Sequence, residues 1–403
     1  MNYKSIFNLL GILLGLFSLS FIPPLVLTFV YSESGREIFL YSFIFLFFLG
    51  GTLWVSTRQK NLPLNISDGF IITTMFWVVL ACAGSIPFYF FGLSISDSIF
   101  ESVSGITTTG ATTIIGLDTL PKSILLYRQL LQWIGGMGLI ILAVAVMPAL
   151  GIGGGQLYKM ELPGSHGNQK LTPKITDSAK ALWKIYVGLT VLCATLYLIS
   201  GMSLFDSIAH SLSTVAGGGF STHDNSIGFF DSGLIETVCI VFMLLSAASF
   251  AVHYAAIFGG KPLKYFYDSE FRFFLSVIIL IIMISLLVHI ISNSYEDIFS
   301  AIKSTIFHTV SIVTTSGFTT ENFSLWPGFL PYLLLVGAFM GACSQSVGGG
   351  IKAWRVLIMI NQAYKEILKT IHPNAVLTSK IGSKVIDAKI AEKVWGFFSI
   401  YVF

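Results

Sequence analysis

Residues 97–110 read DSIFESVSGITTTG, and the chain contains two further copies of this pattern. Residues 206–219 read DSIAHSLSTVAGGG, and residues 304–317 read STIFHTVSIVTTSG. The copies align without a gap: hydroxyl residues stand at the second, sixth and eighth places, Ile at the third and Gly at the fourteenth. They begin 109 and 98 residues apart, which matches a hairpin of two membrane-crossing helices plus a linker.

The composition indicates a membrane protein. Charged residues make up 11% of the 403 positions and hydrophobic residues 54%, whereas about 25% of an ordinary soluble domain is charged. The same numbers exclude a disordered or collagen-like chain. The four Cys lie far apart in apolar stretches without CxxC or His pairing, so they predict neither a zinc site nor a disulfide framework.

Eight uncharged runs are at least 20 residues long, enough for a helix to cross a hydrocarbon core about 30 Å thick. They cover residues 5–32, 38–57, 69–96, 129–158, 185–205, 237–260, 273–295 and 322–351. A ninth begins near Val394. We therefore expect an all-α polytopic membrane protein embedded in a lipid bilayer.

The loops on the two sides of these crossings differ in charge. The side that holds the N-terminus carries 19 of the 23 Lys and Arg, and the other side carries 12 of the 20 Asp and Glu. Basic loops face the cytoplasm, so the N-terminus is predicted to be cytoplasmic and the acidic face to look outward. An acidic outer mouth attracts cations and repels anions.

Each copy of the repeat predicts a re-entrant loop. About ten residues suit a short amphipathic helix that cannot span a membrane, and the Thr, Ser and Gly residues that follow suit non-helical backbone. Such backbone is tolerated at membrane depth only where it is buried in protein or lines a water-filled cavity. Its carbonyls can then replace the hydration shell of a cation, as in potassium filters. The alternative is that these small residues only pack helices together.

The fifth place of the repeat is Glu101, His210 or His308. We expect the two His to pack or to form hydrogen bonds within their short helices, because no spacing here makes a metal site. Glu101 and Asp224 lie near the predicted loops, where they are expected to attract cations or to cap the short helices.

A break is predicted inside the last long run. Residues 341–350 read GACSQSVGGG, and each Gly inside a helix costs about 1 kcal/mol relative to Ala. Flexible backbone below a filter can swing between blocking and clearing the path, so the break is interpreted as a gate. The alternative is a Gly-rich helix contact, with Lys352 extending its ammonium group to the membrane interface.

Several motifs together resemble the TrkH/KtrB family of potassium transporters, and specifically its TrkH branch. They are TTTGAT at 107–112, QLLQWIGGMG at 129–138, QLYK at 156–159, GFSTHD at 219–224, TTSGFTT at 314–320, GGGIK at 348–352 and HPNAV at 372–376. The resemblance covers essentially the whole chain. It implies tandem membrane–pore-loop–membrane repeats around a pseudo-fourfold ion pore, with an extra N-terminal helical hairpin.

The resemblance also implies the domain boundaries. They are a transmembrane hairpin at 1–60, pore repeats at 61–158, 159–260 and 261–372, and the start of a fourth repeat at 373–403. The third repeat includes the gating loop at 341–350. The family's fourth unit only begins before Phe403, so we expect its filter segment to be absent from this sequence.

The resemblance implies that potassium binds to filter residues in the three loops. They are Thr107, Thr108, Thr109, Gly110, Ala216, Gly217, Gly218, Gly219, Thr314, Thr315, Ser316 and Gly317. The second loop departs from the hydroxyl-rich pattern. The implied gate residues are Gly341, Ser344, Gln345, Ser346, Gly348, Gly349, Gly350 and Lys352, the last placing a positive charge near the exit.

The implied function is potassium uptake across the bacterial inner (plasma) membrane by a gated, channel-like transporter. The resemblance further implies a homodimer and a cytosolic nucleotide-binding regulatory subunit of the TrkA type, with no cofactor besides the transported ion and no nucleic-acid partner.

Two alternatives stay open, a Na⁺- or H⁺-coupled potassium symporter and a non-conducting membrane receptor or structural fragment. A symporter should carry acids in mid-membrane, and none lies in the core of the eight runs. An enzyme is not expected, because the loops offer oxygens rather than a nucleophile with its base.

Overall fold

The computed structural model describes residues 3–58, 66–136, 138, 175–375, 380–382, 384–386 and 388–403. The chain forms two compact units. Unit 1 comprises Met1–Leu245 and Ser316–Glu321, and unit 2 comprises Ser246–Thr315 and Asn322–Phe403.

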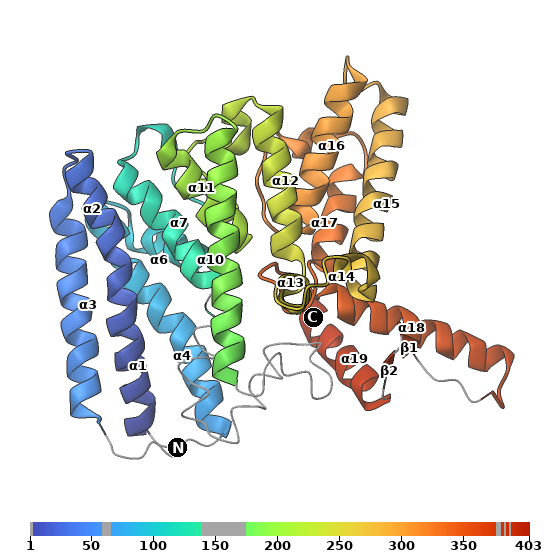
Figure 1. The fold of residues 1–403 in the computed structure, drawn as a ribbon, viewed down its shortest axis with the longest axis horizontal. Helices are drawn as coiled ribbons and strands as arrows, with labels where there is room; N and C mark the ends of the chain where they lie inside the picture. The colour runs from blue at the N-terminus through green and yellow to red at the C-terminus, as the bar shows by residue number, and fades with distance from the viewer. Residues whose placement is uncertain are drawn as a thin grey trace. The chain divides into compact units, whose positions relative to one another are not determined.

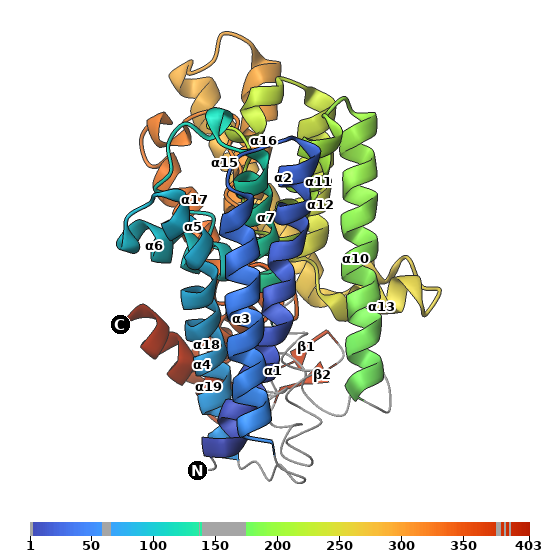
Figure 2. The ribbon, with the colours of Figure 1, turned by 90° about the vertical axis from the view of Figure 1, so that its left-hand side faces the viewer.

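Unit 1 is built from α-helices (Figure 1). They are α1 (Tyr3–Ser18), α2 (Ile22–Val30), α3 (Arg36–Ser56), α4 (Ile66–Gly84), α5 (Ile86–Phe91), α6 (Ile95–Ile106), α7 (Lys122–Gly136), α10 (Ile175–Ile199), α11 (Leu204–Ala216) and most of α12 (Gly233–Ala247). Helix α1 packs against α3 and α4, and Figure 2 shows these three side by side. Helix α7 packs against both α6 and α11, and thereby joins the first two copies of the repeat.

Tyr127 fixes the position of α7 in the core of unit 1. Its ring is fully buried among Phe21, Phe39 and Phe88, with ring centroids 5.1–5.6 Å apart. Its hydroxyl donates a hydrogen bond of 2.7 Å to the carbonyl of Gly84 at the end of α4. A buried phenol needs such a partner, so Tyr127 sets both the depth and the rotation of α7. The polar side chains that follow it on α7 are thereby aimed at the repeat.

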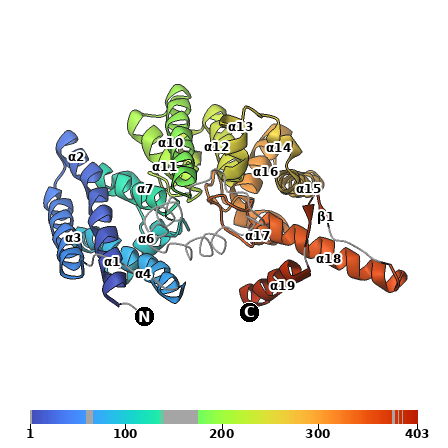
Figure 3. The same cartoon turned by 60° about the horizontal axis from the view of Figure 1, so that its bottom comes forward.

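Unit 2 is also mainly helical. Its elements are α13 (Phe250–Ile257), α14 (Lys264–Tyr267), α15 (Ser269–Ser292), α16 (Ile298–Val313), α17 (Leu330–Met340), α18 (Ala353–Ile371), β1 (Lys380–Ile381), β2 (Lys384–Val385) and α19 (Ala388–Val402). Helix α15 packs against α16, α17 and α18, and α18 packs against α19 (Figure 3). The antiparallel pair of β1 and β2 is a small addition to the expected all-α fold.

The predicted crossings agree in large part with the helices. Among the described residues, five helical segments are long and apolar enough to cross a membrane: Tyr3–Val30, Arg36–Ser56, Asp68–Phe91, Lys180–Ile199 and Ser269–Ser292. The run 237–260 is interrupted, because α12 ends at Ala247 and Ser249 caps the start of α13. This interruption was not predicted from the sequence. Most of the run 129–158 lies outside the described residues.

Candidate functional site

Each copy of the repeat forms a short helix followed by non-helical backbone, as predicted. The helices are α6, α11 and α16. Helices α6 and α11 begin in the same way: the Ser94 and Ser203 hydroxyls each accept a hydrogen bond of 3.1 Å from the backbone N–H of Asp97 and Asp206. Each of these Asp accepts a hydrogen bond from the same Ser in return. A Ser cap with an acid three residues later starts a helix at a fixed residue, so the repeated sequence sets the repeated geometry.

The segments after these helices are here called loop 1 (107–110), loop 2 (216–219) and loop 3 (314–317). In every loop the twelfth and fourteenth residues of the repeat have positive φ and the thirteenth does not. The values are 54° for Thr108, 78° for Gly110, 65° for Gly217, 75° for Gly219, 61° for Thr315 and 84° for Gly317. This conformation costs a non-glycine residue about 1–2 kcal/mol, so Thr108 and Thr315 are strained. Strain repeated at equivalent places is typical of functional sites.

Within unit 1 the loops lie against one another. A methyl group built on Gly110 would overlap the carbonyl oxygen of Gly218, and one on Gly219 would overlap that of Ser316. Glycine is therefore required at both places for close approach as well as for positive φ. A methyl group on Gly317 would meet no heavy atom of the described residues within 4 Å. Loop 2 thus lies between loop 1 and the end of loop 3.

A buried ion pair links the segments that follow loops 1 and 2. Glu101 Oε2 lies 3.2 Å from Arg128 Nε, and both side chains are completely buried. The Glu101 carboxylate also accepts hydrogen bonds from the Thr112 hydroxyl and, at 2.7 Å, from the backbone N–H of Thr113. Arg128 Nη1 donates to the carbonyl of Ser221 at 3.2 Å.

Two sequence-based expectations are corrected by this ion pair. Glu101 neither attracts cations at a pore mouth nor caps a helix, because its buried carboxylate is paired with Arg128 inside the protein. The sequence pattern places Arg128 in an outer loop, because the uncharged run begins one residue later. In the structure α7 begins at Lys122, so Arg128 lies within the helix.

The two His of the repeat form hydrogen bonds, as expected. His210 Nδ1 lies 2.9 Å from the carbonyl oxygen of Asp206, and its Nε2 lies 2.9 Å from the Ser221 hydroxyl. His308 Nδ1 lies 2.9 Å from the carbonyl oxygen of Ser304. His210 therefore connects its short helix to the segment that follows loop 2.

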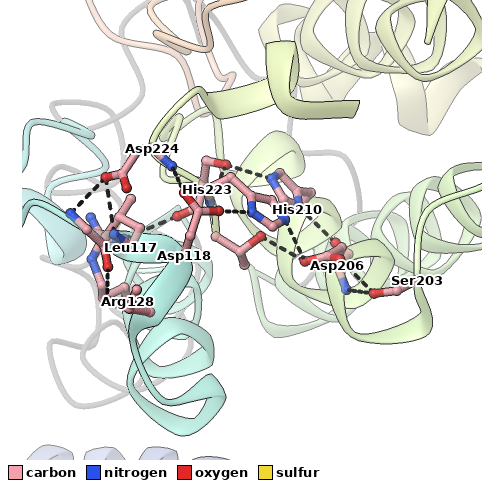
Figure 4. A network of polar contacts seen from close by, with 12 residues as sticks. Leu117, Asp118, Arg128, Ser203, Asp206, His210, His223 and Asp224 are labelled. Atoms are coloured by element: carbon pink, nitrogen blue, oxygen red, sulfur yellow. Dashed lines mark hydrogen bonds and ion pairs between the residues drawn. The ribbon is translucent and has the colours of Figure 1, made fainter. Parts of the chain in front are cut away.

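His223 is the centre of a second network, beyond loop 2 (Figure 4). Its Nδ1 pairs with the Asp118 carboxylate, and its Nε2 lies 3.5 Å from Asp206 Oδ1. Its ring stacks on Phe229 with centroids 3.5 Å apart. Asp224 accepts hydrogen bonds of 3.1 Å from the N–H groups of Gly116 and Leu117, and so caps the short 3-10 helix Leu117–Thr119.

The acids of this network change how its groups titrate. Burial lowers the pKa of His223, but hydrogen bonds and charges from Asp206 and Asp118 outweigh it, and the net shift is upward. The hydrogen bond from His223 lowers the pKa of Asp118. The network therefore favours a protonated His223. Within the described ranges, no group of three or more His, Cys, Asp or Glu is placed so that it could hold a metal ion.

The predicted break in the last long run is confirmed. Helix α17 ends at Met340 and α18 begins at Ala353, and the backbone between them, here called the 341–352 segment, is non-helical. Gly341, Gln345, Gly350 and Lys352 have positive φ there. The remaining predicted gate residues, Ser344, Ser346, Gly348 and Gly349, lie in the same segment. The role of this segment as a gate stays a prediction.

Glu270 connects the 341–352 segment to the first turn of α18, and this role was not predicted from the sequence. This carboxylate on α15 accepts hydrogen bonds from the backbone N–H groups of Ser344, at 2.5 Å, and Trp354, at 3.1 Å. Lys352 folds back onto the segment and donates to the carbonyls of Gly348 and, at 3.4 Å, of Ser346. Its ammonium group thus contacts the segment itself, in contrast to the alternative in which it extends to the membrane interface.

The segment also touches loop 3 within unit 2. The backbone N–H of Gly349 donates a hydrogen bond of 2.6 Å to the Thr315 hydroxyl. A Cβ built on Gly348 would lie 2.8 Å from the carbonyl oxygen of Thr314. The predicted gate and the predicted third filter loop are therefore in direct contact.

The described residues include every predicted filter and gate residue. The motif at 156–159 and the end of the motif at 372–376 lie outside them. Gln132 is a further polar residue near the loops whose position could not be predicted: it hydrogen-bonds to the carbonyl of Gly218. The one sequence signal for it was its place in the motif at 129–138.

The chain is similar to known cation transport proteins over its whole length. The family described as "TrkH: Cation transport protein" matches residues 35–403. The chain is 46% identical to the Trk system potassium uptake protein TrkH of Vibrio parahaemolyticus and 44% identical to that of Escherichia coli K12, covering 100% of this chain and 84% of each relative. The crystal structure of the potassium transporter TrkH from Vibrio parahaemolyticus superposes with a TM-score of 0.90 at 44% identity, over 100% of this chain and 84% of that one. The chain belongs to the TrkH family of cation transport proteins.

Proposed function

We propose that this protein takes up potassium ions as a gated, channel-like membrane transporter. The observation that carries the proposal is the same alternation of φ at the same two places in loops 1, 2 and 3. Such backbone forms neither helix nor strand, so its carbonyl oxygens are not used in secondary structure and can coordinate a dehydrated cation. The names of the relatives, which are potassium uptake proteins, support potassium as that cation.

In this mechanism potassium binds to the filter residues of loops 1–3 and moves down its electrochemical gradient. The membrane potential supplies about 2.3 kcal/mol per charge for every 100 mV. The 341–352 segment blocks the path until it moves. The hydrogen bond between Gly349 and Thr315 supports this role, because it ties the segment to a filter residue.

The proposal places the protein in the bacterial inner membrane with a cytoplasmic N-terminus. The charge asymmetry of the loops supports this orientation. The proposal also includes three pore repeats and the start of a fourth, with the boundaries given above, a homodimer, a cytosolic nucleotide-binding partner of the TrkA type and no cofactor. A chain that only conducts ions has no need of a catalytic group.

The filter is tested by flux into liposomes that contain the full-length protein. Gly110, Gly219 and Gly317 are replaced by Ser one at a time, and uptake of ⁸⁶Rb⁺ is measured in competition with K⁺ or Na⁺. We expect each variant to lose rate or K⁺ preference. If none of the three changes either quantity, loops 1–3 are not the filter. Flux that requires a Na⁺ or H⁺ gradient would favour a symporter.

The gate is tested by deleting residues 344–349 in the same protein. We expect basal flux to rise, because the block is removed. Unchanged or reduced flux from a variant that inserts normally into the membrane would contradict the gating role.

A further inference from the structure

Loop 2 differs from the other two loops because it has no hydroxyl group. Places eleven to thirteen of the repeat are Thr-Thr-Thr in loop 1 and Thr-Thr-Ser in loop 3, but Ala-Gly-Gly in loop 2. In loop 1 the Thr107 hydroxyl donates to the carbonyl of Val103 at 2.7 Å and lies 2.8 Å from the Thr109 hydroxyl. Loop 2 cannot make these contacts, and its glycines lose more conformational freedom on folding than the Thr and Ser residues of the other two loops.

Gln132 of α7 supplies contacts of this kind from outside the loop. Its Nε2 donates a hydrogen bond of 2.6 Å to the carbonyl of Gly218. Its Oε1 accepts hydrogen bonds from the Ser213 hydroxyl at 2.5 Å and from the Phe220 backbone N–H at 3.1 Å. The side chain is completely buried, so these bonds are protected from competing water. One carboxamide therefore fixes the residues on both sides of loop 2 and the loop itself.

The carboxamide also fills the space of the missing side chain. A Cβ built on Gly218 would lie 2.6 Å from Oε1 and 2.7 Å from Nε2 of Gln132. The φ of Gly218 is not positive, so its own backbone would accept a side chain. Thr109 and Ser316 carry a side chain at this place of the repeat. The carboxamide of Gln132 therefore leaves room only for glycine at position 218.

We infer that Gln132 is a positioning residue for loop 2, and that its carboxamide replaces the hydroxyl side chain that loops 1 and 3 carry at the thirteenth place. This inference rests on the proposed filter function. It explains how a loop of three glycines can be held as firmly as two loops rich in Thr and Ser. Gln132 touches the filter backbone and acts on the ion only through it.

The test compares four forms of the full-length protein in liposomes: the unchanged protein, Gln132→Ala, Gly218→Ser and the double variant. Selectivity is read as the ratio of the Na⁺ concentration to the K⁺ concentration that suppresses ⁸⁶Rb⁺ uptake equally, so a lower ratio means lower selectivity for K⁺. We expect each single variant to lose selectivity by roughly fivefold, the equivalent of one net hydrogen bond. The double variant should recover most of that loss, because the introduced hydroxymethyl group then occupies the space that the carboxamide has left.

Gln129 is the matched control. It is also a completely buried glutamine on α7, and among the described residues its amide atoms have no hydrogen-bond partner. Gln129→Ala should leave the selectivity ratio unchanged. If Gln132→Ala is not recovered from the membrane, Gln132→Met keeps the length of the side chain, removes the same bonds and should lower the ratio in the same way.

The inference is overturned if both single variants have the same selectivity ratio as the unchanged protein. It is also overturned if the fold-loss of the double variant equals the product of the two single fold-losses, because the two changes would then act independently. Gly219→Ser in the same assay separates the two proposals. If Gly219→Ser lowers the selectivity ratio but the Gln132 variants do not, the role of Gln132 is rejected and the filter assignment stands. No change in any of these variants rejects the filter as well.

Discussion

Arg128→Met is expected to be one of the most damaging single substitutions in unit 1. It removes the partner of Glu101 and leaves a carboxylate that is completely buried. Two of the hydrogen bonds to that carboxylate remain, from Thr112 and Thr113, but its negative charge is no longer balanced. Breaking a buried pair in this way costs about 3–5 kcal/mol, because the remaining charge stays desolvated. For a unit of roughly this size, about 2–4 °C of thermal midpoint is lost per kcal/mol, so we expect a fall of roughly 6–20 °C.

The double variant Glu101→Gln with Arg128→Met distinguishes the cost of the unpaired Glu101 charge from the cost of changed packing. Gln can still accept from the Thr113 N–H, and no uncompensated charge is left, so the double variant should be more stable than Arg128→Met alone. Thermal unfolding in detergent can be followed with a thiol-reactive dye, because Cys193 and Cys239 are buried in unit 1. Cys82 is exposed and gives the constant background. If the double variant is as unstable as Arg128→Met, the cost does not come from an unpaired Glu101, and our reasoning about this site is wrong.

Three further outcomes are expected. Since the folded-state pKa of His223 is raised above its ordinary value of 6.5, its pairing stabilises the protein fully below about pH 6.5 and less as the pH rises through the raised value. The lowered pKa of Asp118 has the opposite sign, so its contribution is lost as the pH falls below its ordinary value of 3.8. His223→Asn should therefore remove a decline of the thermal midpoint above pH 6.5, and an unchanged pH profile would contradict the pairing. Glu270→Gln should weaken the hold on the 341–352 segment and raise basal flux severalfold in liposomes, whereas equal or lower flux would show that Glu270 does not restrain it. Gly219→Ala should lower the thermal midpoint more than Gly317→Ala, because both have positive φ but only Gly219 lies against a carbonyl oxygen; the reverse order would contradict the arrangement of the loops.

The repeat made most of the local structure near the site predictable. A short helix and the non-helical residues after it depend mainly on neighbours within one copy, so each of the three aligned copies predicted the same local structure. The break after Met340 was predictable for the same reason, since consecutive glycines disfavour a helix whatever surrounds them.

Contacts between copies could not be predicted in this way. The sequence places Arg128 next to an uncharged run, and a charge at such a place normally marks the end of a crossing. Here Glu101, 27 residues earlier, neutralises it inside the protein. Gln132 and Glu270 are similar cases, because each hydrogen-bonds to backbone at least 74 residues away. Only the fold shows that the glycines of loop 2 and the glutamine of α7 belong together.

We claim that loops 1–3 bind the transported ion, and anomalous diffraction from crystals grown with Rb⁺ in place of K⁺ locates the bound ion in the protein. The claim predicts an Rb⁺ peak coordinated by backbone oxygens of Thr107–Gly110 and of the equivalent residues in the other two loops. The peak should disappear, or lose occupancy to Na⁺, in the Gly219→Ser protein. An Rb⁺ peak elsewhere in the protein, with none at these loops, would contradict the claim.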